Sequence, residues 1–338
     1  MTSGRIPVTL LTGFLGSGKT SLLRRVIHQP GFARCAVIIN EFGEVGLDQA
    51  LVSDASDDRD IQLLDSGCLC CLASSAIQDT LASLYYRRLR GEIPWFDRVL
   101  IETSGLAEPG PIINAVYGDD TINRHFVFAG IVTTFDAGFG QQDTDRYAEA
   151  KQQLMMADTI VLTKADTQPD SQVSEAMQWL AYMHPSARLL DNRMPDGELA
   201  DVLLAPAAYA AAPARGDRYQ AVDMDAPKAP GALRHLMRYG IHSVVIDVPA
   251  EVSWPAWAAF VRHAQQELAD RLLRLKGVLV FAGQGPMVVH AVHHLFSAPE
   301  PVARIPGALL GKLVFIVRDL SREEIIQIAQ HLTFFEEN

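Results

Sequence analysis

Residues 5–20, RIPVTLLTGFLGSGKT, decide the fold of the first part of this 338-residue chain. Residues 5–12 are a short apolar run that ends at a glycine, which predicts a buried strand. Positions 13–20 follow the spacing G-x-x-x-x-G-K-[ST], in which glycines let backbone N–H groups curl around a phosphate. Residues 18–29 predict a helix, and its N-terminal dipole favours the same anion. The segment therefore predicts a strand, a phosphate-binding loop and a helix.

The polar side chains of this loop are the first candidate site residues. Lys19 is expected to reach the β- and γ-phosphate oxygens and is a catalytic candidate, and the Thr20 hydroxyl is expected to bind Mg²⁺. The predicted nucleotide-binding residues of the loop are Gly13, Gly16, Ser17, Gly18, Lys19, Thr20 and Ser21.

A second acidic group is needed near Mg²⁺ for nucleotide hydrolysis. Residues 98–102, RVLIE, read as an apolar strand that ends in Glu102, and residues 103–105 make a turn after it. A carboxylate at the carboxyl end of a neighbouring parallel strand points toward the phosphate crevice. Glu102 is therefore the second catalytic candidate, and we expect it to act on Mg²⁺ indirectly. The alternative is an ordinary surface acid.

The choice of base is indicated by TKAD at positions 163–166, which follows the apolar strand 159–162. In guanine-selective GTPases a motif of the Asn-Lys-x-Asp type ends such a strand, and its Asp accepts hydrogen bonds from guanine N1 and the exocyclic amino group. Adenine cannot supply both donors, so the Asp would be left unpaired. Thr163 replaces the Asn here, whereas Lys164 and Asp166 keep the spacing. We expect GTP as the nucleotide, with an ordinary polar loop as the alternative.

Three of the 4 cysteines of the chain, Cys68, Cys70 and Cys71, fall within four positions. Thiolates select Zn²⁺ and other soft or borderline cations such as Co²⁺. Three thiolates leave one position of a tetrahedral site open, and Glu41, a distant histidine or water could complete it. An incomplete site suits a metal ion that must arrive and leave. Redox chemistry and inert packing are the alternatives.

The pattern of elements predicts an α/β chain with two domains. Short apolar runs alternate with helical patterns up to about residue 204, which predicts a mostly parallel sheet in a P-loop NTPase domain over 1–204. Residues 205–235 are rich in Ala, Pro and Gly and predict a linker. Residues 236–338 predict a smaller α+β domain, with a hairpin around 283–286 and a final helix over 322–331. Cys35 falls within a predicted strand and is expected in the core.

Composition excludes several classes of protein. The net charge is −11, which argues against a nucleic-acid groove, because such a groove needs a basic face. No apolar stretch reaches the roughly 18 residues of a membrane helix. The N-terminus lacks the zones of a signal peptide, so we expect a cytoplasmic protein without a membrane partner, whose cysteines are thiols.

Seven segments taken together resemble the CobW-type metallochaperone GTPases, relatives of the urease and hydrogenase nickel-insertion GTPases. They are GFLGSGKTSLL (13–23), NEFGEVGLD (40–48), SGCLCC (66–71), ETSGLAEP (102–109), TKAD (163–166), RLKGVLVFAG (274–283) and VVHAVHHLF (288–296). The motifs of the first domain appear in the family's order, and the resemblance covers nearly the whole chain. Thr163 is compatible with members of this family.

The resemblance implies a GTPase domain whose CxCC cysteines bind Zn²⁺ or a similar ion, and a smaller C-terminal domain that contacts the client. It implies that Glu102 is the acidic residue at the Mg²⁺ site, that residues 40–48 form a nucleotide-sensing switch, and that Glu41 lies near the thiolates. The chain lacks a His-rich loop, so a metal-storage role is not supported.

These observations lead to one hypothesis and two alternatives. The hypothesis is a GTP-hydrolysing metallochaperone that binds Zn²⁺ or Co²⁺ and delivers it to a client metalloprotein under nucleotide control. The alternatives are a GTP-dependent switch that binds a partner without moving metal, and a small-molecule kinase. The sequence names neither the client nor the physiological metal.

Overall fold

The computed structural model describes residues 4–39, 62–65, 75–184, 187–204, 240–248, 251–301 and 310–332. The chain divides into two compact units, Met1–Ala210 and Ala211–Asn338, and each is described by itself. The predicted linker, 205–235, lies outside the described residues.

The first unit is built on a seven-stranded sheet in the order β3-β2-β4-β1-β5-β6-β7. All of its pairings are parallel. The strands are β1 (Ile6–Thr12), β2 (Cys35–Ile39), β3 (Gln62–Asp65), β4 (Arg98–Glu102), β5 (Phe126–Asp136), β6 (Thr159–Thr163) and β7 (Arg188–Asp191). The predicted P-loop NTPase domain with a mostly parallel sheet is confirmed.

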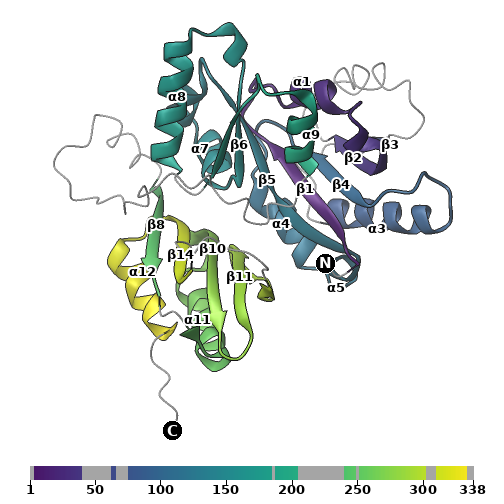
Figure 1. The fold of residues 1–338 in the computed structure, drawn as a ribbon. Coiled ribbons are helices and arrows are strands. Elements are labelled where there is room, and N and C mark those ends of the chain that lie inside the picture. The colour runs from purple at the N-terminus through teal and green to yellow at the C-terminus, as the bar shows by residue number, and fades with distance from the viewer. Residues whose placement is uncertain are drawn as a thin grey trace. The chain divides into compact units, whose positions relative to one another are not determined.

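Helices cover both faces of this sheet (Figure 1). They are α1 (Lys19–Val26), α3 (Ser75–Leu89), α4 (Pro109–Tyr117), α5 (Asp120–His125), α6 (Gly140–Arg146), α7 (Ala148–Met155), α8 (Asp170–Met183) and α9 (Asp196–Leu204), with 3-10 turns η1 (Pro30–Arg34) and η2 (Ala165–Thr167). Leu23 of α1, Leu203 of α9 and Val161 of β6 belong to one buried apolar cluster. The neighbouring Ile160 and Leu162 face α7 and α8 on the opposite side. The strand is therefore apolar on both faces, as parallel sheets require.

The register of the central strands aligns three strand ends. Ile39, the last residue of β2, pairs with Glu102 of β4 on one side and with Asp65 of β3 on the other. Leu11 of β1 pairs with Glu102 as well. Because the strands are parallel, the chain leaves β1, β2, β3 and β4 at the same edge of the sheet.

The described residues of the second unit form a mostly antiparallel sheet and two helices. The main strand order is β12-β11-β10-β14-β8, with β13 on β11 and β9 on β10. The strands are β8 (Ile241–Asp247), β9 (Glu251–Val252), β10 (Leu272–Phe281), β11 (Gly285–Val292), β12 (Leu295–Phe296), β13 (Glu300–Pro301) and β14 (Lys312–Arg318), with α11 (Trp254–Glu267), α12 (Arg322–Ala329), η4 (Ala269–Arg271) and η6 (Gln330–Leu332). The predicted smaller α+β unit is confirmed in its fold class.

Local sequence explains how the elements of this unit begin. Ser321 and Glu324 form a reciprocal capping box at the start of α12, which satisfies two orphan N–H groups. The predicted hairpin around 283–286 is confirmed, because Phe281 pairs with Gly285. The second strand of this hairpin, β11, stops at Val292. His293 adopts a positive φ of 51° and the chain turns back, so that Val292 pairs with Leu295.

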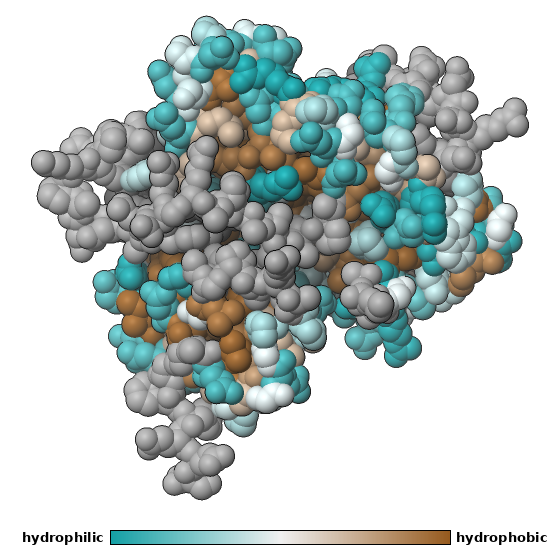
Figure 2. All heavy atoms as spheres, in the orientation of Figure 1, coloured by the Kyte–Doolittle hydropathy of each residue, from teal (hydrophilic) through white to brown (hydrophobic). Residues whose placement is uncertain are grey.

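The surface of the described residues is mixed in polarity. In Figure 2 hydrophilic side chains cover much of the outer surface around α8, a helix that buries Val173, Leu180 and Met183 toward the sheet. Among the described helices, none has the length and hydropathy needed to cross a bilayer. Cys35 is 2% exposed in the core, as predicted, and burial raises the pKa of its thiol to about 12.

Candidate functional site

The phosphate loop connects β1 to α1 and needs its glycines for two different reasons. Gly13, Gly16 and Gly18 have positive φ angles of 144°, 69° and 90°, which side chains rarely tolerate. At Gly13 there is also no room, because a Cβ there would lie 2.3 Å from Thr134 Oγ1. Gly18 immediately precedes α1, so the free N–H groups of the first helical turn face the loop.

Lys19 and Ser17 are held at the base of this loop. The Lys19 ammonium donates to Gly13 O at 2.8 Å and to Phe14 O at 3.3 Å. The Ser17 and Thr134 hydroxyls lie 2.7 Å apart. Both loop side chains are buried, so the ammonium is already folded over the concave side of the loop, where a phosphate would bind. Ser21, in contrast, is exposed on α1.

The two residues expected near Mg²⁺ are brought together. Thr20 Oγ1, in the first turn of α1, donates to Glu102 Oε1 at the end of β4 over 2.5 Å. Glu102 is only 3% exposed. A hydroxyl and a carboxylate beside a phosphate loop are hard oxygen ligands of the type that Mg²⁺ prefers, so the donor set fits this ion.

The loop after Glu102 lies directly against the phosphate loop. A Cβ on Gly105 would come within 2.7 Å of the Leu15 amide nitrogen and 2.8 Å of its Cα. The position therefore accepts only glycine unless one of the two loops moves. Thr103 is fixed to β1 through its amide, which donates to Leu11 O, and through its hydroxyl, which lies 2.9 Å from Thr12 Oγ1.

Thr163 fixes the predicted guanine-binding motif TKAD (163–166), called the base motif below, to the phosphate loop. Its hydroxyl is buried and lies 2.6 Å from Ser17 O and 3.0 Å from Phe135 O. The Thr163 side chain therefore contacts backbone carbonyls of the protein and does not point toward a nucleobase. This contact gives a physical reason why Thr can stand at the position of Asn in this motif: the side chain only has to reach a loop carbonyl.

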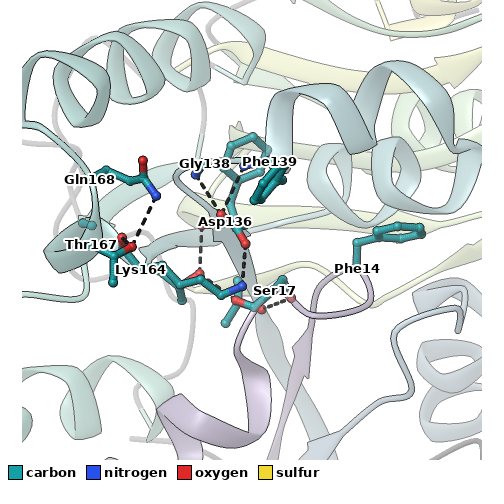
Figure 3. Close-up of polar contacts among 12 residues, drawn as sticks. Phe14, Ser17, Asp136, Gly138, Phe139, Lys164, Thr167 and Gln168 are labelled. Atoms are coloured by element: carbon teal, nitrogen blue, oxygen red, sulfur yellow. Dashed lines mark hydrogen bonds and ion pairs between the residues drawn. The ribbon is translucent and has the colours of Figure 1, made fainter.

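Lys164 is anchored by a carboxylate that sequence reasoning did not identify. Lys164 has a positive φ of 55°, and its ammonium lies 2.7 Å from Asp136 Oδ2. The other oxygen of Asp136 accepts hydrogen bonds from the amides of Gly138 and Phe139 at 2.7 and 3.1 Å. Figure 3 shows this network, in which Asp136 joins the β5–α6 loop to the base motif.

Asp166, the predicted base acceptor, is exposed and is oriented by Asn192 at the end of β7. The Asn192 amide donates to Asp166 Oδ1 at 3.4 Å and accepts from the Ala165 N–H at 3.2 Å. Arg25 of α1 in turn donates to Asn192 O at 2.5 Å and to Met194 O at 2.8 Å. The helix that starts at the phosphate loop thus also supports the base motif.

A small cavity lies under the phosphate loop, lined by Phe14, Ser17, Thr134, Asp136 and Asp143 among others. The Phe14 ring stacks on Tyr147 with centroids 4.8 Å apart. Burial raises the pKa of Asp143, and the neighbouring Asp136 raises it further. The cavity and the aromatic pair place α6 and α7 in direct contact with the loop.

The predicted ligands of the zinc or cobalt site lie outside the described residues. These are Cys68, Cys70, Cys71 and Glu41, and the predicted switch 40–48 falls there as well. Among residues that the structure does describe, no group of three His, Cys, Asp or Glu side chains could hold a metal ion. The cysteine site therefore stays a prediction.

Asp136 and Asn192 were missed by sequence reasoning for different reasons. Asp136 ends an apolar strand in the same way as Glu102, so the signal that identified Glu102 could have identified it too. Asn192 follows β7, a four-residue strand that carries no clear pattern of its own. Its role depends on the position of β7 beside β6.

Family models match both units of the chain. Residues 7–191 match the model described as CobW/HypB/UreG, nucleotide-binding domain. Residues 241–332 match the cobalamin synthesis protein cobW C-terminal domain.

One known protein resembles the chain over nearly its whole length, and another over more than half of it. A protein named zinc chaperone YjiA, from Escherichia coli, is 30% identical over 325 residues, which cover 95% of this chain and 96% of that protein. The crystal structure of the Zn(II)-bound YjiA GTPase from E. coli superposes with a TM-score of 0.65 at 29% identity, over 97% of this chain and 99% of that one. A zinc-regulated GTPase metalloprotein activator from Schizosaccharomyces pombe is 31% identical over 58% of this chain and 47% of its own. The chain therefore belongs to the CobW/HypB/UreG family of nucleotide-binding proteins.

Proposed function

We propose that this chain is a GTP-hydrolysing metallochaperone, which binds Zn²⁺ or Co²⁺ through Cys68, Cys70 and Cys71 and delivers it to a client metalloprotein under nucleotide control. The chain is a P-loop GTPase of its family. Zinc as the cargo is supported by the relatives that are named zinc chaperones, one of which matches along nearly the whole chain.

The observation that carries the coupling of metal to nucleotide is the register of strand ends around Glu102. Ile39 pairs with both Glu102 and Asp65, so β2 and β3 end level with the carboxylate that contacts Thr20. Cys68 is three residues beyond Asp65, and three residues span at most about 11 Å. Glu41 is two residues beyond Ile39. The segments that carry the cysteine motif and the predicted switch therefore follow strands that end level with Glu102, which supports a coupling between the two sites.

The chemistry of the cysteines suits a metal ion in transit. Thiolates bind Zn²⁺ and Co²⁺, and a tetrahedral site with three protein thiolates keeps one position for Glu41, water or a client ligand. Binding requires deprotonated thiols, so the affinity falls at acidic pH. An ion held by an incomplete site can leave by ligand exchange with the client.

The nucleotide is bound and oriented by residues of three loops. The backbone of 13–18 and the Lys19 ammonium hold the phosphates, while Asp166 accepts hydrogen bonds from guanine. Thr20 and Glu102 would hold Mg²⁺, the latter indirectly. When bound, Mg²⁺ would neutralise part of the negative charge of the phosphates. The presence of the γ-phosphate orders the switch 40–48 and the cysteine loop together, because both segments follow strands that end level with Glu102. Its loss on hydrolysis loosens the thiolate site.

The proposal is tested with two variants that separate its parts. Lys19→Ala removes the phosphate contact and should abolish any nucleotide effect on zinc affinity, while zinc still binds weakly. Cys70→Ser should lower zinc affinity and leave GTP binding nearly unchanged. Chelator competition measures the metal and fluorescent nucleotide titration measures GTP. Unchanged zinc affinity in Cys70→Ser would remove the cysteines from the site and favour a partner-binding switch. Consumption of GTP only in the presence of an acceptor metabolite would favour a kinase.

A further inference from the structure

Gln153 fastens α7 to the loop that follows Glu102. Its side chain is 1% exposed. Its amide nitrogen donates to Gly105 O and to Ala107 O, each at 3.0 Å. Its own backbone carbonyl accepts from the Thr133 hydroxyl on β5 at 3.0 Å. The side chain of Gln153 therefore joins the helix to a loop that lies 46 to 48 residues away in the chain, and its backbone carbonyl ties the same residue to the sheet.

The loop held by Gln153 has little room to move toward the phosphate loop. Gly105 lies so close to Leu15 that one added methyl group would overlap the Leu15 backbone. Among the described residues, none accepts a hydrogen bond from the Gly105 N–H. Gly105 thus lies against the phosphate loop, in the segment that directly follows Glu102, and its amide has a donor to offer.

The nitrogen and the oxygen of the Gln153 side-chain amide differ in their hydrogen bonding, because only the nitrogen has partners. Its Oε1 is buried without a hydrogen-bond partner, and it cannot be exchanged with the nitrogen, because both neighbours on the nitrogen side are carbonyl acceptors. Buried acceptors are nearly always paired, so an unpaired one calls for a reason. The reason here is that the amide nitrogen of Gln153 donates to two carbonyls of one loop. An apolar side chain of the same size would avoid the unpaired oxygen but could not make these two hydrogen bonds.

We infer that Gln153 is a positioning residue for GTP hydrolysis, which holds the 103–107 loop so that the Gly105 amide faces the γ-phosphate. The inference rests on the GTPase activity of the chain and is independent of metal delivery. Gln153 is too deeply buried to touch the nucleotide, so it acts through the loop. Because the loop directly follows Glu102, the acid expected near Mg²⁺, the affinity for GDP should depend little on Gln153, whereas the rate of GTP hydrolysis should depend on it strongly.

A neighbouring residue provides a matched control. Gln152 is also buried, at 2% exposure, and lies on the same turn of α7. Its amide reaches Glu108 Oε2 at 3.5 Å, beyond the loop that touches Leu15. Gln152→Met therefore makes the same change of side chain in the same helix without releasing the Gly105 carbonyl.

The test compares Gln153→Met, Gln153→Glu and Gln152→Met in the full chain, with steady-state GTP hydrolysis and equilibrium titration of GDP and a non-hydrolysable GTP analogue. Gln153→Met should lower kcat at least tenfold, because small misplacements of catalytic groups have large effects on rate. GDP affinity should stay within about twofold, while the analogue binds more weakly. Gln152→Met should keep wild-type kcat. Gly105→Ala should reproduce the loss of kcat.

The Gln153→Glu variant supplies a readout that a purely structural role would not change. In its carboxylate form the introduced side chain cannot donate to the two carbonyls, but when protonated it regains one donor. Relative to wild type, kcat of Gln153→Glu should therefore rise as the pH falls. Wild-type kcat in both Gln153 variants, or equal losses of GDP and GTP-analogue affinity, would overturn the inference. If neither Gln153 variant bound GDP, the residue would be a scaffold residue only and the inference would be wrong. Absence of GTP hydrolysis by the wild-type chain would instead contradict the activity itself.

Discussion

The Thr20 hydroxyl and the Glu102 carboxylate meet at 2.5 Å although 82 residues separate them in the chain. The first is fixed by the phosphate loop and the start of α1, and the second by the end of β4. Because β4 and β1 are neighbours in the sheet, this contact links the two strands at the phosphate edge.

Replacing Glu102 with Gln should uncouple GTP binding from turnover. The amide keeps the size of the side chain and can still accept from Thr20, but it has no charge to support Mg²⁺. We expect GTP affinity to change less than about fivefold and kcat to fall on the order of 100-fold, as for the loss of one preorganised electrostatic contact. Phosphate release at several Mg²⁺ concentrations measures both. Glu108→Gln, an exposed site in the same segment, is the control. Equal kcat in the two variants would remove Glu102 from the catalytic site.

Thr163→Val should remove the hydrogen bond that connects the base motif to the phosphate loop. The valine keeps the shape of the side chain but leaves Ser17 O and Phe135 O without the hydroxyl that contacts them. The free energy of unfolding should fall by about 1–3 kcal/mol, and the affinities for GTP and GDP should fall together. Urea denaturation and nucleotide titration test this. Thr167→Val removes a hydroxyl that also contacts a carbonyl, but at an exposed position, and should change little. A matching loss in Thr167→Val would show that burial is not the cause.

Asp166→Asn should change which nucleobase the protein prefers and should leave its contacts with the phosphates unchanged. Guanine presents two donors to the carboxylate, whereas the amide of Asn can also donate to an acceptor. We expect GTP affinity to fall at least tenfold, and xanthosine triphosphate, which has a carbonyl oxygen in place of the amino group, to bind better than GTP. Competition titrations measure the affinities of wild type and variant for GTP and for xanthosine triphosphate. Parallel weakening of both would mean that Asp166 supports the loop without reading the base.

Lys151 of α7 should give the stability of the chain a pH dependence of defined sign. It is 1% exposed, and burial lowers its pKa from 10.5 to about 8, an effect that Asp145 partly opposes. Between these values the unfolded chain binds more protons than the folded one, so the free energy of unfolding rises with pH from about 8 to 10.5. The total is on the order of 3 kcal/mol.

Lys151→Met should remove this rise. The stabilisation of the variant over wild type should be largest at pH 8 and below and should shrink as the pH approaches 10.5, as measured by urea denaturation across this range. A difference between the two proteins that does not vary with pH would show that the ammonium is not desolvated in the folded state.

Parts of the site that depend on short sequence segments were predictable. The spacing of Gly13, Gly18, Lys19 and Thr20 specifies a loop and a helix start, and Glu102 was found because an acid ends an apolar strand. Both features are local, and the parallel order of strands followed from the alternation of elements. The structure adds the distance between Thr20 and Glu102 but does not change the identity of these residues.

The contacts that connect the loops were not predictable in this way. Asp136 and Lys164 are 28 residues apart, Asn192 and Asp166 are 26 apart, and Gln153 and Gly105 are 48 apart. Each pair depends on which strands are neighbours and on the direction of a side chain at a loop. A buried glutamine in a helix carries no motif, and a four-residue strand such as β7 gives no period. Only the arrangement of the sheet in space brings these residues together.

The most direct test of the proposed coupling is the zinc affinity of the full chain with GTP·Mg²⁺, with GDP·Mg²⁺ and without nucleotide, measured by competition with a chelator. The account predicts much tighter zinc binding with GTP than in the other two states. By thermodynamic linkage, zinc should then raise GTP affinity by the same factor. Equal zinc affinity in all three states would contradict nucleotide-controlled delivery and leave a GTPase with an uncoupled metal site.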